Sequence, residues 1–291
     1  MYEIVSNEQI APRVHRILVR VPKIALKRRA GQFVIVRVTE QCERVPLTIA
    51  DSDPEQGTIT LVVQAVGRST IILCQLQPGE SILDVVGPLG HPTHIERLGH
   101  VVVVGGGIGT AVAMPIAAAM KAAGNRVSAV IGGRTRELVI LEDDLRRIAG
   151  DDGDVVVCTD DGSYGRKGLV TDALAEMIAE PGAVDLVVAI GPVPMMEAVC
   201  NLTRGPGVPT VVSLNPIMID GTGMCGGCRV TVGGQTRFAC VDGPEFDGHA
   251  VDFKELRNRL SAFRDMEAQA REHAEEYCRL DEQVRRMENG Q

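Results

Sequence analysis

The sequence predicts an antiparallel β-barrel followed by an α/β domain with a parallel sheet, and after these a small glycine-rich module and a helical tail. Three observations predict this order. Short β-branched runs fill residues 1–98, strand-then-helix units follow in residues 99–205, and glycine-rich sequence with few helix signals occupies residues 206–250. We expect a domain boundary wherever the pattern changes, with the tail in residues 251–291.

The first region has the pattern of half-buried strands. Its segments RVHRILVRV, QFVIVRV and TITLVVQAV alternate or are rich in β-branched residues, and Gly, Pro and Asp turns separate them. Several such runs at short spacing are typical of antiparallel sheets that close or stack. Residues 1–98 are therefore expected to form an antiparallel barrel.

The second region alternates strands and helices. VVVVG precedes AMPIAAAMKAAG, VSAVIGG precedes LEDDLRRIAG, DVVVC follows, and VDLVVAIG precedes MMEAVCNL. This alternation predicts a parallel sheet flanked by helices. The uncharged stretch from Val101 to Met120 is long enough to span a membrane, but its three consecutive glycines and Pro115 favour a strand, a tight turn and a packed helix.

Composition and charge exclude several classes of partner. The chain has 291 residues, 45% of them hydrophobic, and a formal charge of −8. No basic stripe is present that would bind nucleic-acid phosphates. The N-terminal MYEIVSNEQI has an acid and polar residues where a signal peptide would have basic residues and an apolar run. We expect a cytoplasmic protein with no nucleic-acid and no membrane partner.

A glycine loop lies between the first predicted strand and helix of the α/β domain. The loop, GGGIGT, offers unpaired N–H groups and a helix dipole that can hold a pyrophosphate, through Gly105, Gly106, Gly107 and Thr110. It departs from G-x-G-x-x-G because Thr110 takes the place of the third glycine. A purely structural turn is the alternative.

Two further segments, CTDDGSYGRKG and AIGPVPMM, end later strands of the same domain. With the glycine loop they resemble the NAD(P)-binding domain of the ferredoxin reductase family, and the resemblance implies that Gly191 and Pro192 lie near the nicotinamide. Asp160 and Asp161 can bind a ribose hydroxyl and would repel a 2′-phosphate, which favours NAD. Arg134, together with Arg136, keeps NADP open.

The barrel segments AGQFVIVRV, ERVPLTIAD and VVGPLGHP resemble the FAD-binding segments of that family in order and spacing. The family usually shows R-x-Y-[ST] in the second segment, whereas here Arg44 is displaced by one residue and Leu47 replaces the tyrosine. Thr48 matches the hydroxyl residue near the reactive nitrogen of the flavin, which makes it the catalytic candidate. The remaining flavin contacts implied by the resemblance are Gly31, Gln32, Phe33, Pro46 and Gly87.

The glycine-rich module contains DGTGMCGGC, and the spacing of its candidate ligands is D-x4-C-x2-C-x11-C. Cys225, Cys228 and Cys240 supply three thiolates, and Asp220 stands where a plant-type [2Fe–2S] loop has a fourth cysteine. We expect Asp220 to be the fourth ligand. Asp-Gly is also a common turn pair, Cys200 is the alternative fourth donor, and a zinc site is a further alternative.

The cluster segment narrows the resemblance. It is similar to the electron-transfer subunits of dihydroorotate dehydrogenase and closer still to the small subunits of NADH-dependent ferredoxin:NADP oxidoreductases, which bifurcate electrons. This resemblance implies a ferredoxin reductase-like FAD barrel, an NAD(P) domain and a [2Fe–2S] module. It also implies an NAD(P)H-dependent oxidoreductase subunit that exchanges hydride with NAD(H) or NADP(H) and passes single electrons to a larger flavin and iron–sulfur subunit.

The partner expected from this resemblance completes a heterodimer or a higher assembly, with ferredoxin reached through the complex. The alternatives are a dihydroorotate dehydrogenase-type subunit and a self-sufficient reductase of a soluble acceptor. In the tail, apolar residues recur mostly at steps of three and four from Phe253 to Met287. One long helix or a helix pair is expected, either packed on its own protein or docked to a partner subunit.

Overall fold

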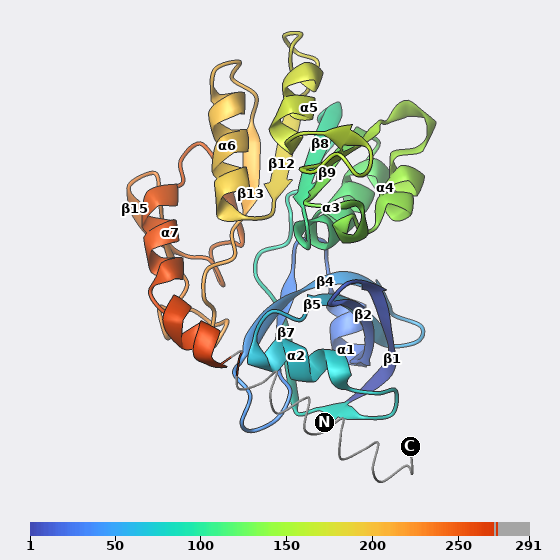
Figure 1. Cartoon of the computed structure of the whole chain (residues 1–291), viewed down its shortest axis with the longest axis vertical. Helices are drawn as coiled ribbons and strands as arrows, with labels where there is room; N and C mark the ends of the chain where they lie inside the picture. The colour runs from blue at the N-terminus through green and yellow to red at the C-terminus, as the bar shows by residue number, and fades with distance from the viewer. Residues whose placement is uncertain (271, 273–291) are drawn as a thin grey trace.

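A computed structural model describes residues 1–270 and 272 and shows a barrel, a sheet covered by helices on both faces, and a smaller lobe beside them (Figure 1). All barrel strands are antiparallel to their neighbours, in the order β6-β1-β2-β5-β4-β3-β7. The elements are β1 (Tyr2–Ala11), β2 (Val14–Arg20), α1 (Pro22–Lys27), β3 (Phe33–Arg37), β4 (Val45–Asp53), β5 (Thr58–Gln64), α2 (Arg68–Gln75), β6 (Ser81–Ile82) and β7 (Asp84–Leu89).

The barrel nearly closes because its two edge strands, β6 and β7, are adjacent in the chain. The sequence of β3 is a continuous apolar run, and the position of the strand in the fold explains it. Its residues Val34 and Val36 pack in the barrel core, whereas Phe33 and Ile35 face outward and are also buried. Since side chains alternate along a strand, an apolar residue at every position indicates burial on both faces.

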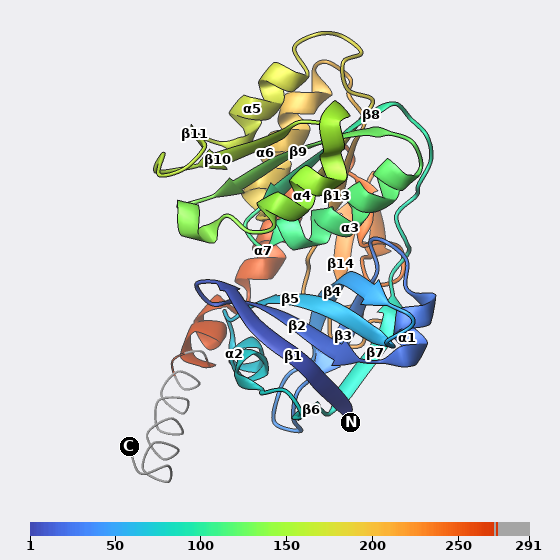
Figure 2. The same cartoon turned by 90° about the vertical axis from the view of Figure 1, so that its right-hand side faces the viewer.

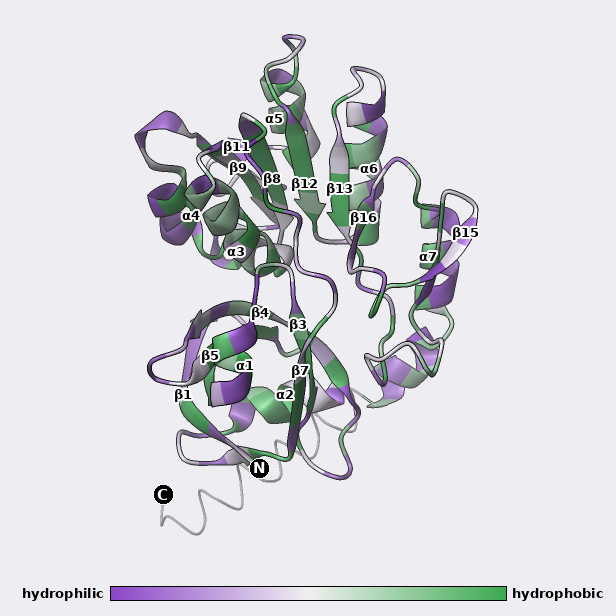
Figure 3. Ribbon diagram, turned by 180° about the vertical axis from the view of Figure 1, so that it is seen from behind, coloured by the Kyte–Doolittle hydropathy of each residue, from purple (hydrophilic) through white to green (hydrophobic). Residues whose placement is uncertain are grey.

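The second sheet has the order β11-β10-β9-β8-β12-β13-β16, parallel except for β16. Figure 3 shows its central strands largely in green, the colour of hydrophobic residues. The elements are β8 (His100–Gly106), α3 (Gly109–Ala122), β9 (Arg126–Gly133), a 3₁₀ turn η1 (Arg136–Leu138), α4 (Glu142–Ala149), a second turn η2 (Gly150–Asp152), β10 (Val155–Thr159), β11 (Arg166–Lys167), α5 (Val170–Met177), β12 (Leu186–Ile190), α6 (Val193–Arg204) and β13 (Thr210–Ser213).

The four-valine run is buried on both faces of this sheet. Val101 and Val103 pack with α3 and α4, and Val102 and Val104 pack with α5 and α6. The stretch Val101–Met120 therefore divides into strand β8, a glycine turn and helix α3, as expected. Within residues 1–270 and 272, no helix is long and apolar enough to cross a membrane.

Strand β8 lies between β9 and β12, so the chain winds in opposite directions from it (Figure 1). Figure 2 shows this domain above the barrel, with α3 on the side that faces the barrel. In open α/β sheets, ligands bind at the carboxyl ends of the strands where the winding reverses. The loops that follow β8 and β12 meet at this point. Helix α3 also rests on the barrel, because Ala111 joins Val14, Ala50 and Val62 in one apolar cluster.

The smaller lobe contains a two-stranded sheet of β14 (Arg229–Val232) and β15 (Gln235–Phe238), followed by β16 (Glu245–Asp247) and α7 (Phe253–Ser261). Strands β13 and β16 come from the range expected for the cluster module, yet both belong to the second sheet. After α7 the chain turns at Ala262 and Phe263 and continues as helix over residues 264–270.

One long helix or a helix pair was expected for the tail, and its described part is a helix interrupted at Ala262 and Phe263. Phe253 and Leu256 are buried against the lobe, whereas Phe263 and Met266 are exposed. The later positions of the predicted apolar seam, from Tyr277 to Met287, lie outside the described residues. The first part of the seam therefore packs on its own protein.

Candidate functional site

The glycine loop connects β8 to the N-terminus of α3. Gly107 has φ +54° and donates its N–H to the carbonyl of Gly132 at 2.8 Å. A side chain at Gly107 would meet no atom within 4 Å, so the backbone faces open space where a phosphate can approach. Thr110 is buried and its hydroxyl packs on Gly105, so its expected contribution is to shape the turn.

The loop after β12 lies directly against the glycine loop. A methyl group on Gly191 would lie 3.1 Å from Cα of Gly106, and one on Gly106 would lie 3.0 Å from Pro192. Only glycine permits this approach of two backbones. The structure therefore brings together the two segments that sequence reasoning assigned to the pyrophosphate and the nicotinamide.

The segments after β9 and β10 also meet. The N–H of Asp160 donates to the carbonyl of Gly133 at 3.1 Å, and that of Asp161 donates to the carbonyl of Arg134 at 3.3 Å. Bonds from the Ser163 hydroxyl and N–H lower the pKa of the Asp161 carboxyl. Asp160, Asp161 and Arg134 thus share one exposed rim at the carboxyl ends of the strands.

This rim also contains Arg136, which the sequence indicated as a possible NADP contact, and Tyr164, which it did not indicate. The Arg136 guanidinium lies 5.2 Å from the ring centre of Tyr164, and the Arg136 N–H donates to the Ser163 hydroxyl at 2.8 Å. Cation–π contact of this kind orders an otherwise exposed arginine. For Tyr164, the only signal in the sequence was its place within a glycine-rich loop.

The flavin-type segments are neighbours on the barrel. Phe33 of β3 pairs with Thr48 of β4, and Leu47 packs partly against the barrel core. Gln32 is buried and bridges two segments, since its amide nitrogen donates to the carbonyl of Gly90 at 2.9 Å and its oxygen accepts from the Arg29 N–H at 3.0 Å. These contacts fix the turn before β3, and the Ile49 N–H of the strand that carries Thr48 donates to the Gln32 carbonyl at 3.1 Å.

The other flavin candidates are placed around this pair. Pro46 is on β4 and Gly87 is on β7, where a side chain would meet Val34 at 2.8 Å. Arg44 is exposed just before β4. A second arginine, which sequence reasoning missed, contacts the strand that carries Thr48: the Arg28 guanidinium donates to the carbonyls of Ile49 and Ala50 at 3.0 and 3.1 Å.

The cluster loop is organised by Asp220. Its carboxylate accepts N–H bonds from Thr222 at 3.1 Å, Met224 at 3.1 Å and Cys225 at 2.9 Å. These bonds, led by the one from Thr222, lower the pKa of the Asp220 carboxyl to about 2. Asp220 is thus a turn residue, and its ionised carboxylate retains lone pairs for a metal.

The thiols of Cys228 and Cys240 lie 3.2 Å apart and are buried, whereas Cys225 is exposed at the loop surface. Burial raises the pKa of the Cys240 thiol to about 12, so metal binding there would have to displace a proton. In the described part of the chain, no three His, Cys, Asp or Glu side chains are yet gathered around one point. The donor set of three thiols and a carboxylate nevertheless fits iron–sulfur chemistry.

Cys200, the alternative donor, belongs to a different environment. It is buried on α6, where its sulfur packs against Gly248, and burial raises the pKa of its thiol to about 12. Its charged neighbours are Arg204 and Asp247, neither of which belongs to the cluster loop. The packing of Cys200 is that of a small apolar core residue.

The cluster loop rests on the outer face of β3. A methyl group on Gly221, which has φ +74°, would lie 2.6 Å from a methyl of Leu89 and 3.0 Å from Ile35. Phe33 and Ile35 share one apolar core with Cys228 and Cys240. A single strand therefore contacts the flavin-type segment through its pairing with β4 and the cluster loop through its outer face.

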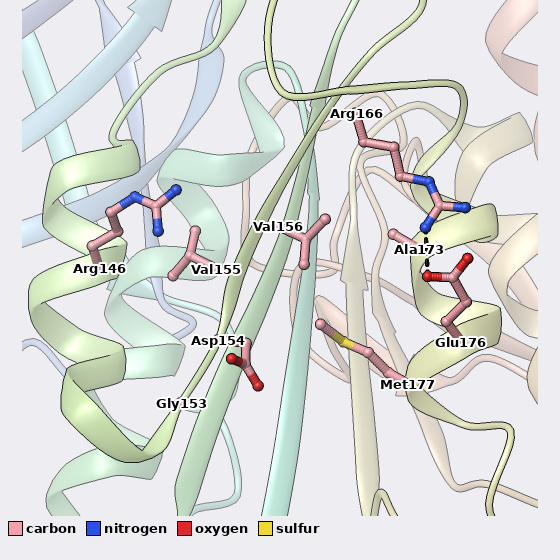
Figure 4. A pocket seen from close by; sticks show the side chains of 9 residues that line it. All are labelled: Arg146, Gly153, Asp154, Val155, Val156, Arg166, Ala173, Glu176 and Met177. Atoms are coloured by element: carbon pink, nitrogen blue, oxygen red, sulfur yellow. Dashed lines mark hydrogen bonds and ion pairs between the residues drawn. The ribbon is translucent and has the colours of Figure 1, made fainter.

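The cavities lie outside these segments. One of about 430 Å³ is open between α4 and α5 beside strand β10, where Arg166 is paired with Glu176 at 2.6 Å (Figure 4). It is at the amino end of β10, opposite the nucleotide rim. Another, of about 490 Å³, lies between the barrel and α3 and is lined by Arg29, Thr93 and His94 among others.

Three family models match successive parts of the chain. An oxidoreductase FAD-binding domain matches residues 2–94, an oxidoreductase NAD-binding domain matches residues 103–201, and the iron–sulfur cluster binding domain of dihydroorotate dehydrogenase B matches residues 215–252. These matches confirm the predicted fold class, the oxidoreductase assignment and the FAD, NAD-type and [2Fe–2S] cofactors. Which residues contact each cofactor stays a prediction.

Similar proteins cover nearly the whole chain. The dihydroorotate dehydrogenase B (NAD(+)) electron transfer subunit homolog of Thermotoga maritima is 49% identical over 91% of this chain and 92% of its own length. The corresponding subunit of Geobacillus thermodenitrificans is 33% identical over 84% of this chain and 94% of its own.

A solved structure of NADH-dependent reduced ferredoxin-NADP oxidoreductase superposes with TM-score 0.87 and 47% identity, covering 94% of this chain and 97% of that one. Its similarity confirms the resemblance drawn from the cluster segment. The chain belongs to the family of dihydroorotate dehydrogenase B electron-transfer subunits.

Proposed function

We propose that this protein takes hydride from NADH onto FAD and passes the electrons singly, through a [2Fe–2S] cluster held by Asp220, Cys225, Cys228 and Cys240, to a larger partner subunit. The observation that carries this proposal is strand β3, which pairs with the Thr48 strand and supports the cluster loop on its other face. Flavin and cluster sites that share one strand suit a short electron path.

The residues of the chain have distinct parts in this proposal. Bound FAD supplies the conversion between two-electron and one-electron chemistry. The loop of Gly105, Gly106 and Gly107 would seat the nucleotide pyrophosphate at the N-terminus of α3, and Gly191 and Pro192 would place the nicotinamide. The Thr48 hydroxyl would offer a hydrogen bond to the flavin from β4.

NADH is favoured over NADPH by the charge of the rim. Asp160 and Asp161 are both at the carboxyl end of β10, where each would accept a hydrogen bond from a ribose hydroxyl and would repel a 2′-phosphate. Asp161 is held ionised by its bonds to Ser163. Arg134 contacts this aspartate through its backbone carbonyl, and its exposed side chain is the group that would support NADPH binding instead.

The larger assembly that we infer is an electron-bifurcating NADH-dependent ferredoxin:NADP oxidoreductase, in which ferredoxin is reached through the partner subunit. The 47% identity to the solved oxidoreductase over 94% of this chain supports it. The second candidate is a dihydroorotate dehydrogenase-type complex, favoured by the names of relatives such as the 33% identical Geobacillus subunit.

Rapid-mixing reduction under anaerobic conditions tests the nucleotide assignment. Flavin bleaching in the purified protein should show a kcat/KM for NADH at least about tenfold above that for NADPH, which corresponds to about 1.4 kcal/mol. The Asp160→Asn and Asp161→Asn variants should lower the ratio of kcat/KM for NADH to kcat/KM for NADPH, and Arg134→Ala should not lower it. A kcat/KM for NADPH equal to or above that for NADH would overturn the assignment. Addition of dihydroorotate to the native complex distinguishes the second candidate.

A further inference from the structure

The carboxyl of Glu245 lies where three segments of the chain meet. Glu245 begins β16, Thr93 belongs to the linker between barrel and sheet, and Gly31 precedes β3. The Thr93 hydroxyl donates to Glu245 Oε1 at 2.6 Å. A methyl group on Gly31 would lie 2.5 Å from the same oxygen, so the carboxyl is seated against the flavin-type turn.

Backbone hydrogen bonds hold this junction on every side. The Thr93 N–H donates to the carbonyl of Ala30 at 2.9 Å, the His91 N–H donates to that of Gly243 at 2.7 Å, and the Leu214 N–H donates to that of Pro244 at 2.9 Å. The Glu245 side chain therefore has a fixed place. It extends from β16, the strand that follows the cluster loop, to Gly31 in the turn before β3.

The junction is also close to the outer face of β3. A methyl group on Gly90 would lie 2.8 Å from the Phe33 ring and 3.0 Å from Pro244, the residue before Glu245. On the same outer face of β3, Ile35 lies against the cluster loop, since a methyl group on Gly221 would be 3.0 Å from it. Glu245 is thus tied through one packed layer to the strand on which the cluster loop rests, while being five residues beyond Cys240 in the chain.

Burial raises the pKa of the Glu245 carboxyl to about 7, with the Thr93 hydroxyl acting in the opposite direction. The titratable side chains of the surrounding segments are Arg29 before the turn, His91 and His94 in the linker, and Asp247 on β16. The carboxyl can therefore take up or release a proton near neutral pH.

We propose that Glu245 is a redox-linked proton site, which binds one proton from solvent when an electron reaches the neighbouring cluster and returns it when the electron leaves. The physical cause is Coulombic: an added negative charge nearby favours the neutral acid over the carboxylate. Linkage is reciprocal, so the neutral acid also raises the affinity of the cluster for its electron. This inference rests on the proposed function only for the source of the electrons.

The test is a redox titration of the cluster in the holoprotein at several pH values, with the reduced cluster detected by electron paramagnetic resonance. In the wild-type protein, the midpoint potential should fall as pH rises above about 7, by up to 59 mV for each tenfold change in proton concentration. In Glu245→Gln, which keeps a neutral side chain, the potential should stay at the acid value throughout. Asp247→Asn, on the same strand, should retain the wild-type slope.

A second variant checks the same assignment with the carboxyl intact. Because the Thr93 hydroxyl lowers the pKa of Glu245, Thr93→Val should move the bend of the potential-against-pH curve to higher pH. Equal slopes in wild type and Glu245→Gln, or an unmoved bend in Thr93→Val, would overturn the inference. Reduction by NADH in the same samples reports separately on the proposed function, because dithionite can supply the electrons for the titration.

Discussion

Replacement of Gly31 by alanine should destabilise the protein far more than the same change at Gly79. Both glycines have positive φ, +81° and +90°, so each alanine pays the left-handed penalty of about 1–2 kcal/mol. A methyl group on Gly79 would meet no atom within 4 Å. At Gly31, the new methyl would overlap the Thr93 hydroxyl and lie 2.5 Å from Glu245 Oε1 and 3.0 Å from the Thr93 nitrogen.

The excess cost at Gly31 follows from these contacts. Displacing the Thr93 and Glu245 side chains loses a hydrogen bond that contributes about 0.5–1.5 kcal/mol. Overpacking adds about 1–3 kcal/mol. An excess of about 2 kcal/mol should lower the midpoint of thermal unfolding by roughly 4–8 °C beyond the effect of Gly79→Ala, in a protein of this size.

Thermal unfolding followed by flavin fluorescence and by circular dichroism measures this difference. Thr93→Ala removes the hydroxyl that the new methyl would overlap, so the Gly31→Ala/Thr93→Ala double variant should be less destabilised than the sum of the two single changes. Equal midpoints for Gly31→Ala and Gly79→Ala would refute the reasoning, because the two sites differ in their surroundings and not in backbone conformation.

Two further predictions concern the cluster and the tail. Asp220→Cys should retain the cluster with a shifted electron-paramagnetic-resonance signal and Asp220→Ala should make it labile, whereas Cys200→Ala should leave the spectrum unchanged; the opposite pattern would assign the fourth ligand to Cys200. A chain ending at Ala262 keeps α7 in place but removes the exposed Phe263 and Met266, so it should bind FAD normally and assemble weakly with the larger subunit in pull-down experiments. Full assembly would show that the tail beyond α7 is not part of the interface.

Hydrophobic pattern predicted the architecture because it reports burial, which is a property of each segment by itself. The run FVIVR indicated burial on both faces of one strand, and VVVV indicated a strand inside a covered parallel sheet. The short helices α1 and α2 were not predicted. Neither has an acidic residue in its first turn or a Ser, Thr, Asp or Asn at its N-cap, and Pro22 at the start of α1 is a weak signal alone.

Contacts between segments that are far apart in the chain could not be predicted from the hydrophobic pattern. Thr93 and Glu245 are 152 positions apart, and neither belongs to a motif. Strand β16 is three residues long and joins the sheet antiparallel, which its sequence does not indicate. Contacts of this kind form only when two segments that have already folded come to lie side by side. The contact between Thr93 and Glu245 also requires that Gly31, which lies against both side chains, has no side chain of its own.

Asp220 can be interpreted as a turn residue or as a cluster ligand, and the two roles are compatible. As a turn residue, it accepts three N–H bonds and arranges the backbone that leads to Cys225. The Thr222 hydroxyl also donates to Asp220 Oδ2, at 3.2 Å, whereas Oδ1 accepts only the Thr222 N–H and so keeps a lone pair for a metal ion. Hydrogen bonds to a ligating carboxylate are also the usual means by which a protein orients that ligand. The same N–H bonds that make Asp220 a turn residue would therefore hold its carboxylate ready for iron.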